Sequence, residues 1–416
     1  MKIAQINMVS TSSTGKIMLQ IARCGRERGH ETYTFSVPGF SIRHPEKLVE
    51  HPGHQYVGTP FEHAVHYVLG KYTGRNGYFS QITTWQLVRR LKEIQPDIIH
   101  LHNIHNWSLN FPMLFRYIKE SGAKVVWTLH DCWTFTGQCP YFDMVACDKW
   151  KTGCHDCPQC DVYPETKIDR SRQMYRKKQE WFLGIRDLVL VTPSRWLAEL
   201  TAQSYMGGYP IRVIHNGIDL SVFTKTDSDF RKKYRCEDKI ILLGVAFGWG
   251  RRKGLDVFIE LSQRLDSRFQ IVLVGTSEAT DAQLPDNIIS IHTTQNQQEL
   301  AEIYSAADCF LNPTREDNFP TVNLEALACG TPVVTFRTGG SPECIDDTCG
   351  CVVETDDIDA FEQAVRRVAE GSLYGADACR ARAEQFNMYD RFAEYVALYE
   401  EIMNTAETGT MNEQQQ

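Results

Sequence analysis

The alternation of short apolar runs with amphipathic stretches constrains the fold of this chain more than any other feature of its sequence. Each run is rich in β-branched residues and almost continuously apolar, as expected for a strand buried on both faces. Strands and helices in alternation predict right-handed βαβ units and a parallel sheet. In the first half, strands are predicted at residues 2–9, 31–37, 97–101, 123–129, 188–192 and 211–215, and helices at 15–28, 83–94, 110–121 and 167–185.

The same rhythm restarts after a polar stretch at residues 224–238, with strands predicted at 239–246, 269–275, 288–292, 309–312 and 332–336. The predicted fold class is therefore α/β, with two doubly wound, Rossmann-like domains that face a central cleft. We expect these domains at residues 1–219, with a cysteine-rich insertion at 132–165, and at residues 220–385. A helix at 386–404 is expected to pack back on the N-terminal domain, and the polar tail at 405–416 to be disordered.

Charge and hydropathy limit the partners and the location that can be expected. The chain has 44 Lys and Arg residues and 52 Asp and Glu residues, which give a net charge of −8. It lacks the excess of basic residues that proteins use to bind nucleic-acid phosphates, so we predict no nucleic-acid partner. No run of about 18 apolar residues is present, and the first residues enter a strand pattern without the apolar segment of a signal peptide. We therefore expect a cytoplasmic protein.

Candidate ligand contacts follow the predicted strands, because open α/β sheets bind ligands beyond the carboxyl ends of their strands. In the first domain, Gly15 lies in a loop that opens a helix, which is either an anion-binding loop or a plain helix cap. His130 follows a strand directly, and it either faces the cleft or is satisfied by loop backbone. Asn216 begins an Asn-Gly turn after the last strand of this domain, and alone it indicates no more than a turn.

The second domain carries a basic loop and a pair of acids. The segment 248–254 contains three glycines and the cations Arg251, Arg252 and Lys253, so it is either a solvated basic loop or a clamp for a diphosphate. Asp317 and Glu325 lie eight positions apart, in a loop and on the following helix. Such carboxylates suit hydrogen bonds from sugar hydroxyls, while helix N–H groups serve phosphates.

Taken in order, these residues resemble the signature of glycosyltransferase family 4, whose retaining enzymes have the GT-B fold. The central match is the block 317–334, with its two acids, Ala-rich helix and Gly-Thr-Pro-Val-Val turn. The stretches 130–137 and 149–154 are similar to the branch found in bacterial exopolysaccharide and colanic-acid-type biosynthesis. Further matches are Thr14-Gly15-Lys16, Leu129-His130-Asp131, Asn216-Gly217-Ile218-Asp219, Lys253-Gly254 and Gly339-Gly340-Ser341-Pro342-Glu343.

The resemblance implies a role for each matched residue. Glu325 would bind the donor's ribose hydroxyls, while Asp317, with the backbone at Asn318 and Phe319, would hold the transferred sugar. Lys253 would hold the diphosphate, and His130 would contact the sugar from the acceptor-side N-terminal domain. Gly15 would let the first loop approach the reacting centre. The catalytic set is His130, Asp317 and Lys253, and the donor-binding set is Gly15, Asn216, Arg251, Arg252, Lys253, Asn318, Phe319 and Glu325.

Two positions depart from the family's pattern. The first acid is Asp317 where glutamate is usual, although Glu316 is adjacent, and Val245 stands where an arginine is common. Arg251 or Arg252 could replace that missing phosphate cation.

The implied reaction moves a hexosyl unit from a nucleotide diphosphate sugar, of the UDP or GDP type, to a glycan or polyprenyl-linked oligosaccharide, with anomeric configuration retained. No cofactor is required for this catalysis, because Lys253 and helix N-termini would stabilise the departing diphosphate. The alternatives are a nucleotide-sugar epimerase on the same scaffold and a non-catalytic glycan-binding relative.

Six of the 14 cysteines fall between residues 132 and 160. The spacing of Cys139, Cys147, Cys154 and Cys157 is typical of a structural zinc site, and such a polar insertion is expected to lack a core of its own. Reduced thiols and disulfides are the alternatives.

The predicted helix at 167–185 is unusually basic. Between Lys167 and Arg186, seven residues are basic and two are acidic, interleaved with Met174, Tyr175, Trp181, Phe182 and Leu183. The helix either packs on the sheet with a solvated basic face or lies on an anionic membrane surface. The second interpretation predicts a peripheral protein at the inner face of the cytoplasmic membrane.

Overall fold

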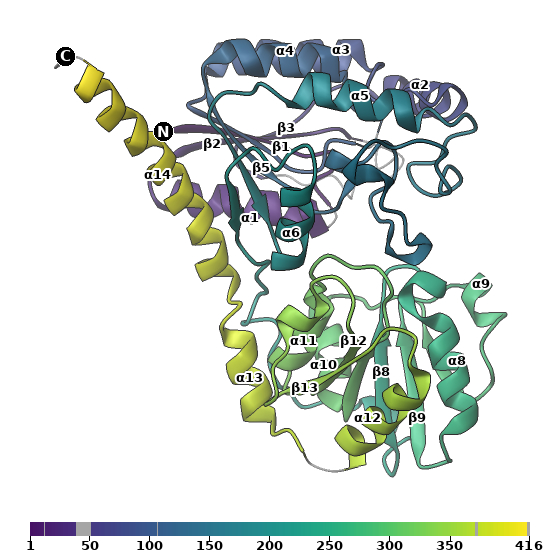
Figure 1. The fold of residues 1–416 in the computed structure, drawn as a ribbon. Helices are drawn as coiled ribbons and strands as arrows, with labels where there is room; N and C mark the ends of the chain where they lie inside the picture. The colour runs from purple at the N-terminus through teal and green to yellow at the C-terminus, as the bar shows by residue number, and fades with distance from the viewer. Residues whose placement is uncertain (12, 39–50, 106, 371–372, 414–416) are drawn as a thin grey trace. The chain divides into compact units, whose positions relative to one another are not determined.

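The computed structural model describes residues 1–11, 13–38, 51–105, 107–370 and 373–413, and it divides the chain into two compact units. Unit 1 comprises Met1–Ile214 and Phe392–Gln416, and unit 2 comprises His215–Arg391 (Figure 1). The division falls a few residues before the expected boundary at 219.

Unit 1 is built on a seven-stranded parallel sheet in the order β3-β2-β1-β4-β5-β6-β7. Ile3 pairs with Thr32 of β2 on one side and with Ile98 of β4 on the other, so β1 is an interior strand of the sheet. The strands are β1 (Lys2–Ile6), β2 (Glu31–Ser36), β3 (His54–Tyr56), β4 (Ile98–Leu101), β5 (Lys124–Thr128), β6 (Leu188–Thr192) and β7 (Ile211–Val213).

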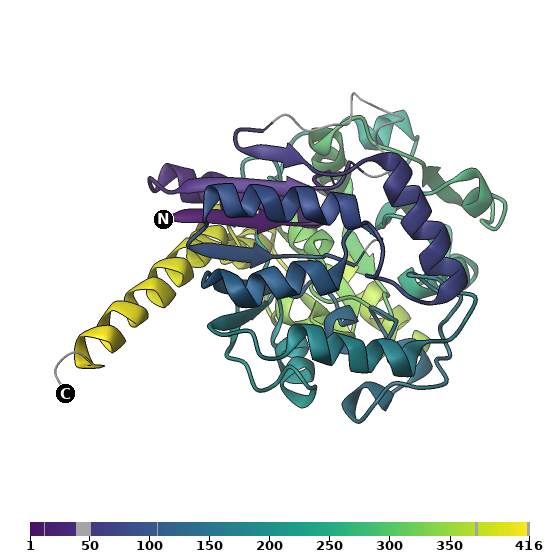
Figure 2. The ribbon, with the colours of Figure 1, turned by 90° about the horizontal axis from the view of Figure 1, so that it is seen from above.

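Helices cover both faces of this sheet, and Figure 2 shows several of them side by side. The helices of unit 1 are α1 (Ser13–Glu27), α2 (Pro60–Thr73), α3 (Gln81–Ile94), α4 (Phe111–Ser121), α5 (Ser171–Phe182) and α6 (Arg195–Gln203). The C-terminal helix α14 (Met388–Glu413) starts in unit 2, and its residues from Phe392 onward belong to unit 1. There the hydroxyl of Tyr399 lies 2.6 Å from His100 Nδ1 on β4.

Unit 2 contains a six-stranded parallel sheet in the order β10-β9-β8-β11-β12-β13. Its strands are β8 (Ile240–Val245), β9 (Phe269–Val274), β10 (Ile288–Ile291), β11 (Cys309–Asn312), β12 (Val333–Phe336) and β13 (Gly350–Val353). Its helices are α7 (Phe230–Lys233), α8 (Leu255–Arg264), α9 (Glu278–Asp281), α10 (Gln297–Ala306), α11 (Thr321–Ala328), α12 (Ile358–Glu370) and α13 (Ala376–Glu384).

The strand orders of the two sheets determine where ligands can bind. The order reverses between β1 and β4 in unit 1, and between β8 and β11 in unit 2. Ligands of open α/β sheets bind beyond the carboxyl ends of the strands at such reversals. In unit 2 the loops at this point are residues 246–254 and 313–320, which contain the basic loop and the acid Asp317 that the sequence analysis singled out.

The predicted α/β class with two parallel, Rossmann-like sheets is confirmed, and each predicted strand exists within a few residues of its expected bounds. The short strands β3 and β13 and the helices α2 and α6 of unit 1 were not predicted. Of the tail that was expected to be disordered, residues 405–413 continue α14, while residues 414–416 lie outside the described residues. A helix that is already packed propagates at little cost, because its nucleation is complete.

Of the two interpretations of the basic helix α5, the structure supports the one in which its apolar side chains pack on the sheet. Met174, Trp181 and Phe182 are buried in the core of unit 1. Lys178, counted among the basic residues, is 1% exposed, and its Nζ donates to the carbonyls of Trp133 at 2.6 Å and Thr136 at 3.0 Å. The helix packs on the sheet because its apolar residues share one face. No helix of the described residues is long and apolar enough to cross a membrane.

Candidate functional site

The basic loop of unit 2 lies against the end of β11. Its short 3₁₀ turn, Arg251–Lys253, is followed by Gly254, whose φ of 75° is left-handed. A Cβ at Gly254 would lie 2.4 Å from the carbonyl oxygen of Pro313, so a side chain there would separate the two loops. This close approach brings Lys253 Nζ to 2.5 Å from Asp317 Oδ2, with both side chains 18% exposed. The turn therefore joins a cation and a carboxylate that are 64 residues apart.

Arg315 holds the basic loop in place. Its guanidinium binds both carboxylate oxygens of Asp256 at 2.8 Å, contacts Asp356 at 2.7 Å and donates to the carbonyl of Arg251 at 2.6 Å. Its backbone N–H also donates to the carbonyl of Arg252 at 2.8 Å. The side chain is buried, whereas both aspartates are about half exposed. Arg315 is therefore a positioning residue for the turn that carries Lys253.

Replacing Arg315 with methionine should lower the free energy of unfolding of unit 2 by about 1–3 kcal/mol, because charge-assisted hydrogen bonds are lost while the exposed aspartates become hydrated. Arg268→Met is the matched control, since this exposed arginine also contacts two carboxylates, those of Asp266 and Glu370. For the control, urea denaturation should show a loss of unfolding free energy of at most about 1 kcal/mol. Equal losses in the two variants would show that Arg315 is only another surface ion-pair partner.

The acidic loop is fixed by a glycine turn that follows β12. Gly339 has a φ of 53°, and a Cβ there would lie 1.7 Å from the carbonyl oxygen of Asp317. The N–H of Gly340 donates to the carbonyl of Asn318 at 2.9 Å. Only glycine permits such an approach, so the predicted Gly-Gly motif shapes the backbone of the acid. Glu316, the neighbouring acid, is buried, so Asp317 is the more accessible carboxylate.

Glu325 lies on α11, and its Oε2 accepts a hydrogen bond from the hydroxyl of Tyr304 at 3.1 Å. Burial and this carboxylate raise the pKa of Tyr304 well above its usual value, so the phenol stays a donor. Tyr304 thus orients Glu325 from α10. Neither the tyrosine nor its role was predicted from the sequence, because the two residues lie on different helices.

Residues of the Asn216 turn and of the acidic loop also meet within unit 2. The ring of His215 lies 5.0 Å from that of Phe319, and His215 Nε2 lies 3.2 Å from Glu343 Oε2. Asn216 itself is buried. The structure therefore brings the predicted residues Asn216 and Phe319 into one neighbourhood, through a histidine that the sequence analysis did not assign.

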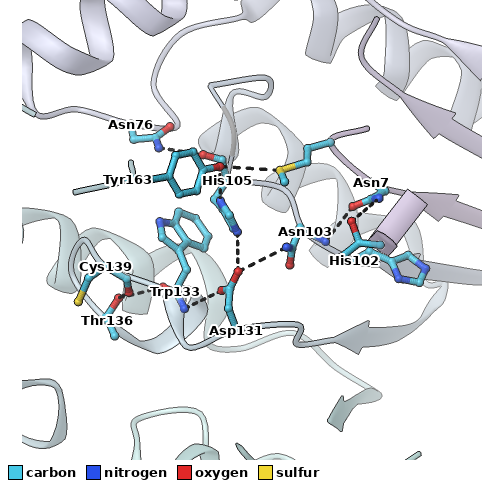
Figure 3. A network of polar contacts seen from close by, with 12 residues as sticks. Asn7, Asn76, His102, Asn103, His105, Asp131, Trp133, Thr136, Cys139 and Tyr163 are labelled. Atoms are coloured by element: carbon cyan, nitrogen blue, oxygen red, sulfur yellow. Dashed lines mark hydrogen bonds and ion pairs between the residues drawn. The ribbon is translucent and has the colours of Figure 1, made fainter. Parts of the chain in front are cut away.

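In unit 1, Asp131 is the centre of a polar network (Figure 3). Its Oδ2 accepts from His105 Nε2 at 3.0 Å, and its Oδ1 accepts from the N–H of Trp133 at 2.9 Å. The other nitrogen of His105 lies 3.0 Å from the hydroxyl oxygen of Tyr163. Burial opposes ionisation of Asp131, but the charge of His105 and these hydrogen bonds outweigh it and lower its pKa. The network fixes the loop that begins at His130.

A second chain of contacts determines the proton position on His130. Gln5 Oε1 lies 3.0 Å from His102 Nε2, and His102 Nδ1 lies 3.2 Å from His130 Nε2. Because the amide oxygen of Gln5 only accepts, His102 carries its proton on Nε2, and His130 Nε2 is then the donor to His102. Burial lowers the pKa of His130 to about 4, so the ring is neutral near pH 7. The participation of Gln5 and His102 was not predicted.

Gly15 lies in a tightly packed turn at the start of α1. A Cβ at this position would lie 2.4 Å from the backbone carbon of Ser10, so the glycine is required where α1 packs on its own preceding loop. This packing explains the residue without any ligand. A role of the loop in binding stays a prediction.

The expected zinc ligands Cys139, Cys147, Cys154 and Cys157 line a cavity of about 20 Å³. Across the residues that the structure describes, no three His, Cys, Asp or Glu side chains form a group that could hold a metal ion, and the zinc site stays a prediction. A hydrogen bond joins the thiols of Cys139 and Cys157, and the described cysteines are free thiols. The stacked rings of Phe142 and Trp150, 5.1 Å apart, give the insertion the apolar core that was not expected.

Two family profiles match consecutive parts of the chain. The profile described as Glycosyltransferase Family 4 matches residues 14–222, half of the chain. The profile described as Glycosyl transferases group 1 matches residues 237–371. Neither match supports the epimerase or the non-catalytic alternative.

Individual relatives agree with these profiles. The chain is 25% identical to the putative colanic acid biosynthesis glycosyl transferase WcaC of Escherichia coli K12 over 319 residues, which are 74% of this chain and 77% of that protein. It is also similar in structure to sucrose-phosphate synthase of Thermosynechococcus elongatus (TM-score 0.71, 18% identity, 97% and 99% of the two chains). Anabaena HepE, solved in complex with UDP-glucose, has a TM-score of 0.64 at 14% identity, over 98% of this chain and 99% of HepE. These likenesses identify the fold as GT-B.

Proposed function

The chain belongs to glycosyltransferase family 4, and we propose that it transfers a hexosyl unit, with retention of configuration, from a UDP or GDP sugar to a glycan or polyprenyl-linked oligosaccharide. The observation that carries the proposal is the Lys253–Asp317 pair, 2.5 Å apart on two loops at the strand-order reversal of unit 2. The ammonium group of Lys253 would bind the diphosphate, and the carboxylate of Asp317 would accept a hydrogen bond from a hydroxyl of the adjoining sugar. The relative in colanic acid biosynthesis supports a role in cell-surface polysaccharide synthesis.

In this proposal the reaction breaks the bond between the anomeric carbon and the β-phosphate oxygen. The acceptor oxygen bonds to the same face of that carbon, and its proton passes to an oxygen of the departing phosphate. Negative charge grows on the diphosphate as the bond breaks, so Lys253, with Arg251 and Arg252 on the same turn, would stabilise the transition state more than the ground state. Asp317 would accept a hydrogen bond from a hydroxyl of the transferred sugar.

The remaining residues would bind and orient the substrates. Glu325, held by Tyr304, would accept hydrogen bonds from the ribose hydroxyls, while the backbone of Asn318 and Phe319 would line the sugar position. Neutral His130 would contact the transferred sugar from unit 1, with its proton position determined by His102 and Gln5. Asn216 would contribute from the turn that begins unit 2. Gly15 would act through the shape of the first loop.

Nucleotide binding can be tested by thermal unfolding with UDP, GDP and their hexose conjugates. A ligand at 100 times its dissociation constant stabilises the native state by about 2.7 kcal/mol, which corresponds to an increase in Tm of about 5–10 °C for a unit of this size. We expect one of the two nucleotide families to give this increase. Adenosine diphosphate is the control, and equal shifts with all nucleotides would contradict a specific donor site.

We also propose that the protein acts at the inner face of the cytoplasmic membrane, where a polyprenyl-linked acceptor presents its glycan. The chemistry of the acceptor supports this location. The lipid of a polyprenyl-linked acceptor stays in the bilayer, so the enzyme must reach the glycan at the membrane surface. The surface that would make this contact cannot be the apolar face of α5, which is buried.

A further inference from the structure

Helix α2 presents its apolar side chains to solvent and its polar side chains to the protein. Its buried residues are His63, His66 and Gly70, and His66 Nδ1 lies 2.7 Å from Ser80 Oγ. The exposed residues share the helical spacing of a single stripe, and they are Phe61, Val65, Val68, Leu69 and Tyr72. A surface helix of a soluble protein normally has the opposite orientation. The reversed pattern therefore requires an apolar environment on the outer side of α2.

The start of α3 extends this apolar stripe. The carboxylate of Glu62 on α2 accepts hydrogen bonds from the N–H groups of Ile82 and Thr83 at 2.8 and 2.9 Å, which docks the first turn of α3 beside the first turn of α2. Ile82 is 62% exposed, next to Phe61 at 79%, and Trp85 is exposed one turn later. The α2–α3 face, defined as these seven exposed side chains, is thus one continuous surface of unit 1. An exposed set of this size normally marks an interaction site.

Basic residues adjoin the α2–α3 face at the C-terminal end of α2. The N–H of Lys167 donates to the carbonyl of Lys71 at 2.7 Å, and a Cβ at Gly74 would lie 2.6 Å from Cγ of Arg170, so the segment 167–170 lies against this end of the helix. Arg170 is exposed and lines a groove with Arg172, Arg176 and Lys177 of α5, where these four cations outnumber the acids Asp156, Asp169 and Glu180. The guanidinium of Arg89 lies 5.4 Å from the centre of the Trp85 ring. Apolar and aromatic side chains beside solvated cations are the composition of a surface that binds anionic lipid.

We propose that the α2–α3 face of unit 1 binds an anionic phospholipid bilayer, with Phe61, Tyr72 and Ile82 inserting below the headgroups and the 167–177 segment contacting lipid phosphates. The basic half of the surface is the segment that the sequence indicated, and the apolar half comes from helices that the sequence analysis did not connect with it. This inference rests on the proposed membrane location of the enzyme. It is independent of the nucleotide chemistry of unit 2.

The test compares flotation of the full-length protein with vesicles of phosphatidylcholine alone and with one third phosphatidylglycerol, in low salt. The apolar variant is Phe61→Gln, Tyr72→Gln, Ile82→Gln. Its matched control is Phe247→Gln, Tyr389→Gln, Leu373→Gln, which removes two aromatic and one aliphatic side chain that are also exposed, in unit 2. We expect the apolar variant to bind anionic vesicles at least about tenfold more weakly, while the control binds as the wild type does. A charge variant should lose about fivefold in affinity for anionic vesicles per substituted residue; its substitutions are Arg170→Gln, Arg172→Gln and Arg176→Gln.

Equal vesicle binding of the wild type and the apolar variant would show that the α2–α3 face does not bind lipid, but it would not contradict the membrane location. Absence of wild-type binding would overturn both, and the nucleotide-induced Tm shift would still report separately on the transferase proposal. If the wild type instead forms dimers that the apolar variant does not, as measured by light scattering, the face is an interface between copies and the lipid proposal is wrong. Because all substituted side chains are exposed, unchanged Tm values should show that every variant is folded.

Discussion

Replacing Lys253 with methionine should lower kcat by about 10²–10³-fold, equivalent to about 2.7–4 kcal/mol of transition-state stabilisation. The side chain sits at the strand-order reversal of unit 2, where its Nζ is held 2.5 Å from Asp317. Charge on a leaving diphosphate develops only as the glycosidic bond breaks, so the loss should appear mainly in kcat. Methionine keeps the length and apolar stem of lysine and removes the charge.

The measurement is initial-rate kinetics with the donor identified by thermal unfolding. Lys232→Met is the control, because Lys232 is a lysine of the same unit whose side chain is 78% exposed and whose partner is a nearby surface aspartate. It should retain the wild-type kcat. A Lys253 variant whose KM rises while kcat is unchanged would show that the lysine binds ground state and transition state equally, which contradicts the proposed role.

Glu325→Ala should weaken nucleotide binding by about 10–150-fold, because hydrogen bonds from neutral hydroxyls to a carboxylate contribute about 1.5–3 kcal/mol. Calorimetric titration with the nucleoside diphosphate alone measures this effect without any turnover. Tyr304→Phe removes the hydroxyl that lies 3.1 Å from Glu325 and orients it, and this variant should weaken nucleotide binding by less than tenfold.

His130→Ala provides the contrast to Glu325→Ala. It should leave the affinity for the nucleoside diphosphate unchanged and lower turnover, because its proposed contact is with the transferred sugar. If both variants bind the nucleotide and turn over as the wild type does, these site assignments are wrong.

The sequence was sufficient to predict both parallel sheets because strands buried on two faces are almost continuously apolar. It did not show β3, whose three residues, His54, Gln55 and Tyr56, carry no apolar run. Helix α2 was missed for a different reason. Its apolar residues have helical spacing, but a periodicity cannot say whether the apolar face points to the core or to solvent.

Side-chain contacts over long sequence separations explain the other omissions. Arg315 binds Asp256 and Asp356, which are 59 and 41 residues away, so no local motif connects the three. Lys178 looked like one more cation of a basic helix, yet it is buried against the carbonyls of Trp133 and Thr136. The cysteine spacing is typical of a metal site, but spacing along the chain does not determine how close the thiols lie in the folded protein.

The course of α14 has a consequence for the order in which the molecule is made. Its Tyr399 hydroxyl meets His100 across 299 residues, and its residues from Phe392 onward complete unit 1. A ribosome therefore releases all seven strands of unit 1, and then the whole of unit 2, before it supplies the helix that covers His100. Unit 2 can fold while synthesis continues, whereas the first unit to emerge is the last to be finished. A chain interrupted before residue 392 would keep the partners of Tyr395 and Tyr399 uncovered, which is the kind of surface that chaperones and proteases bind.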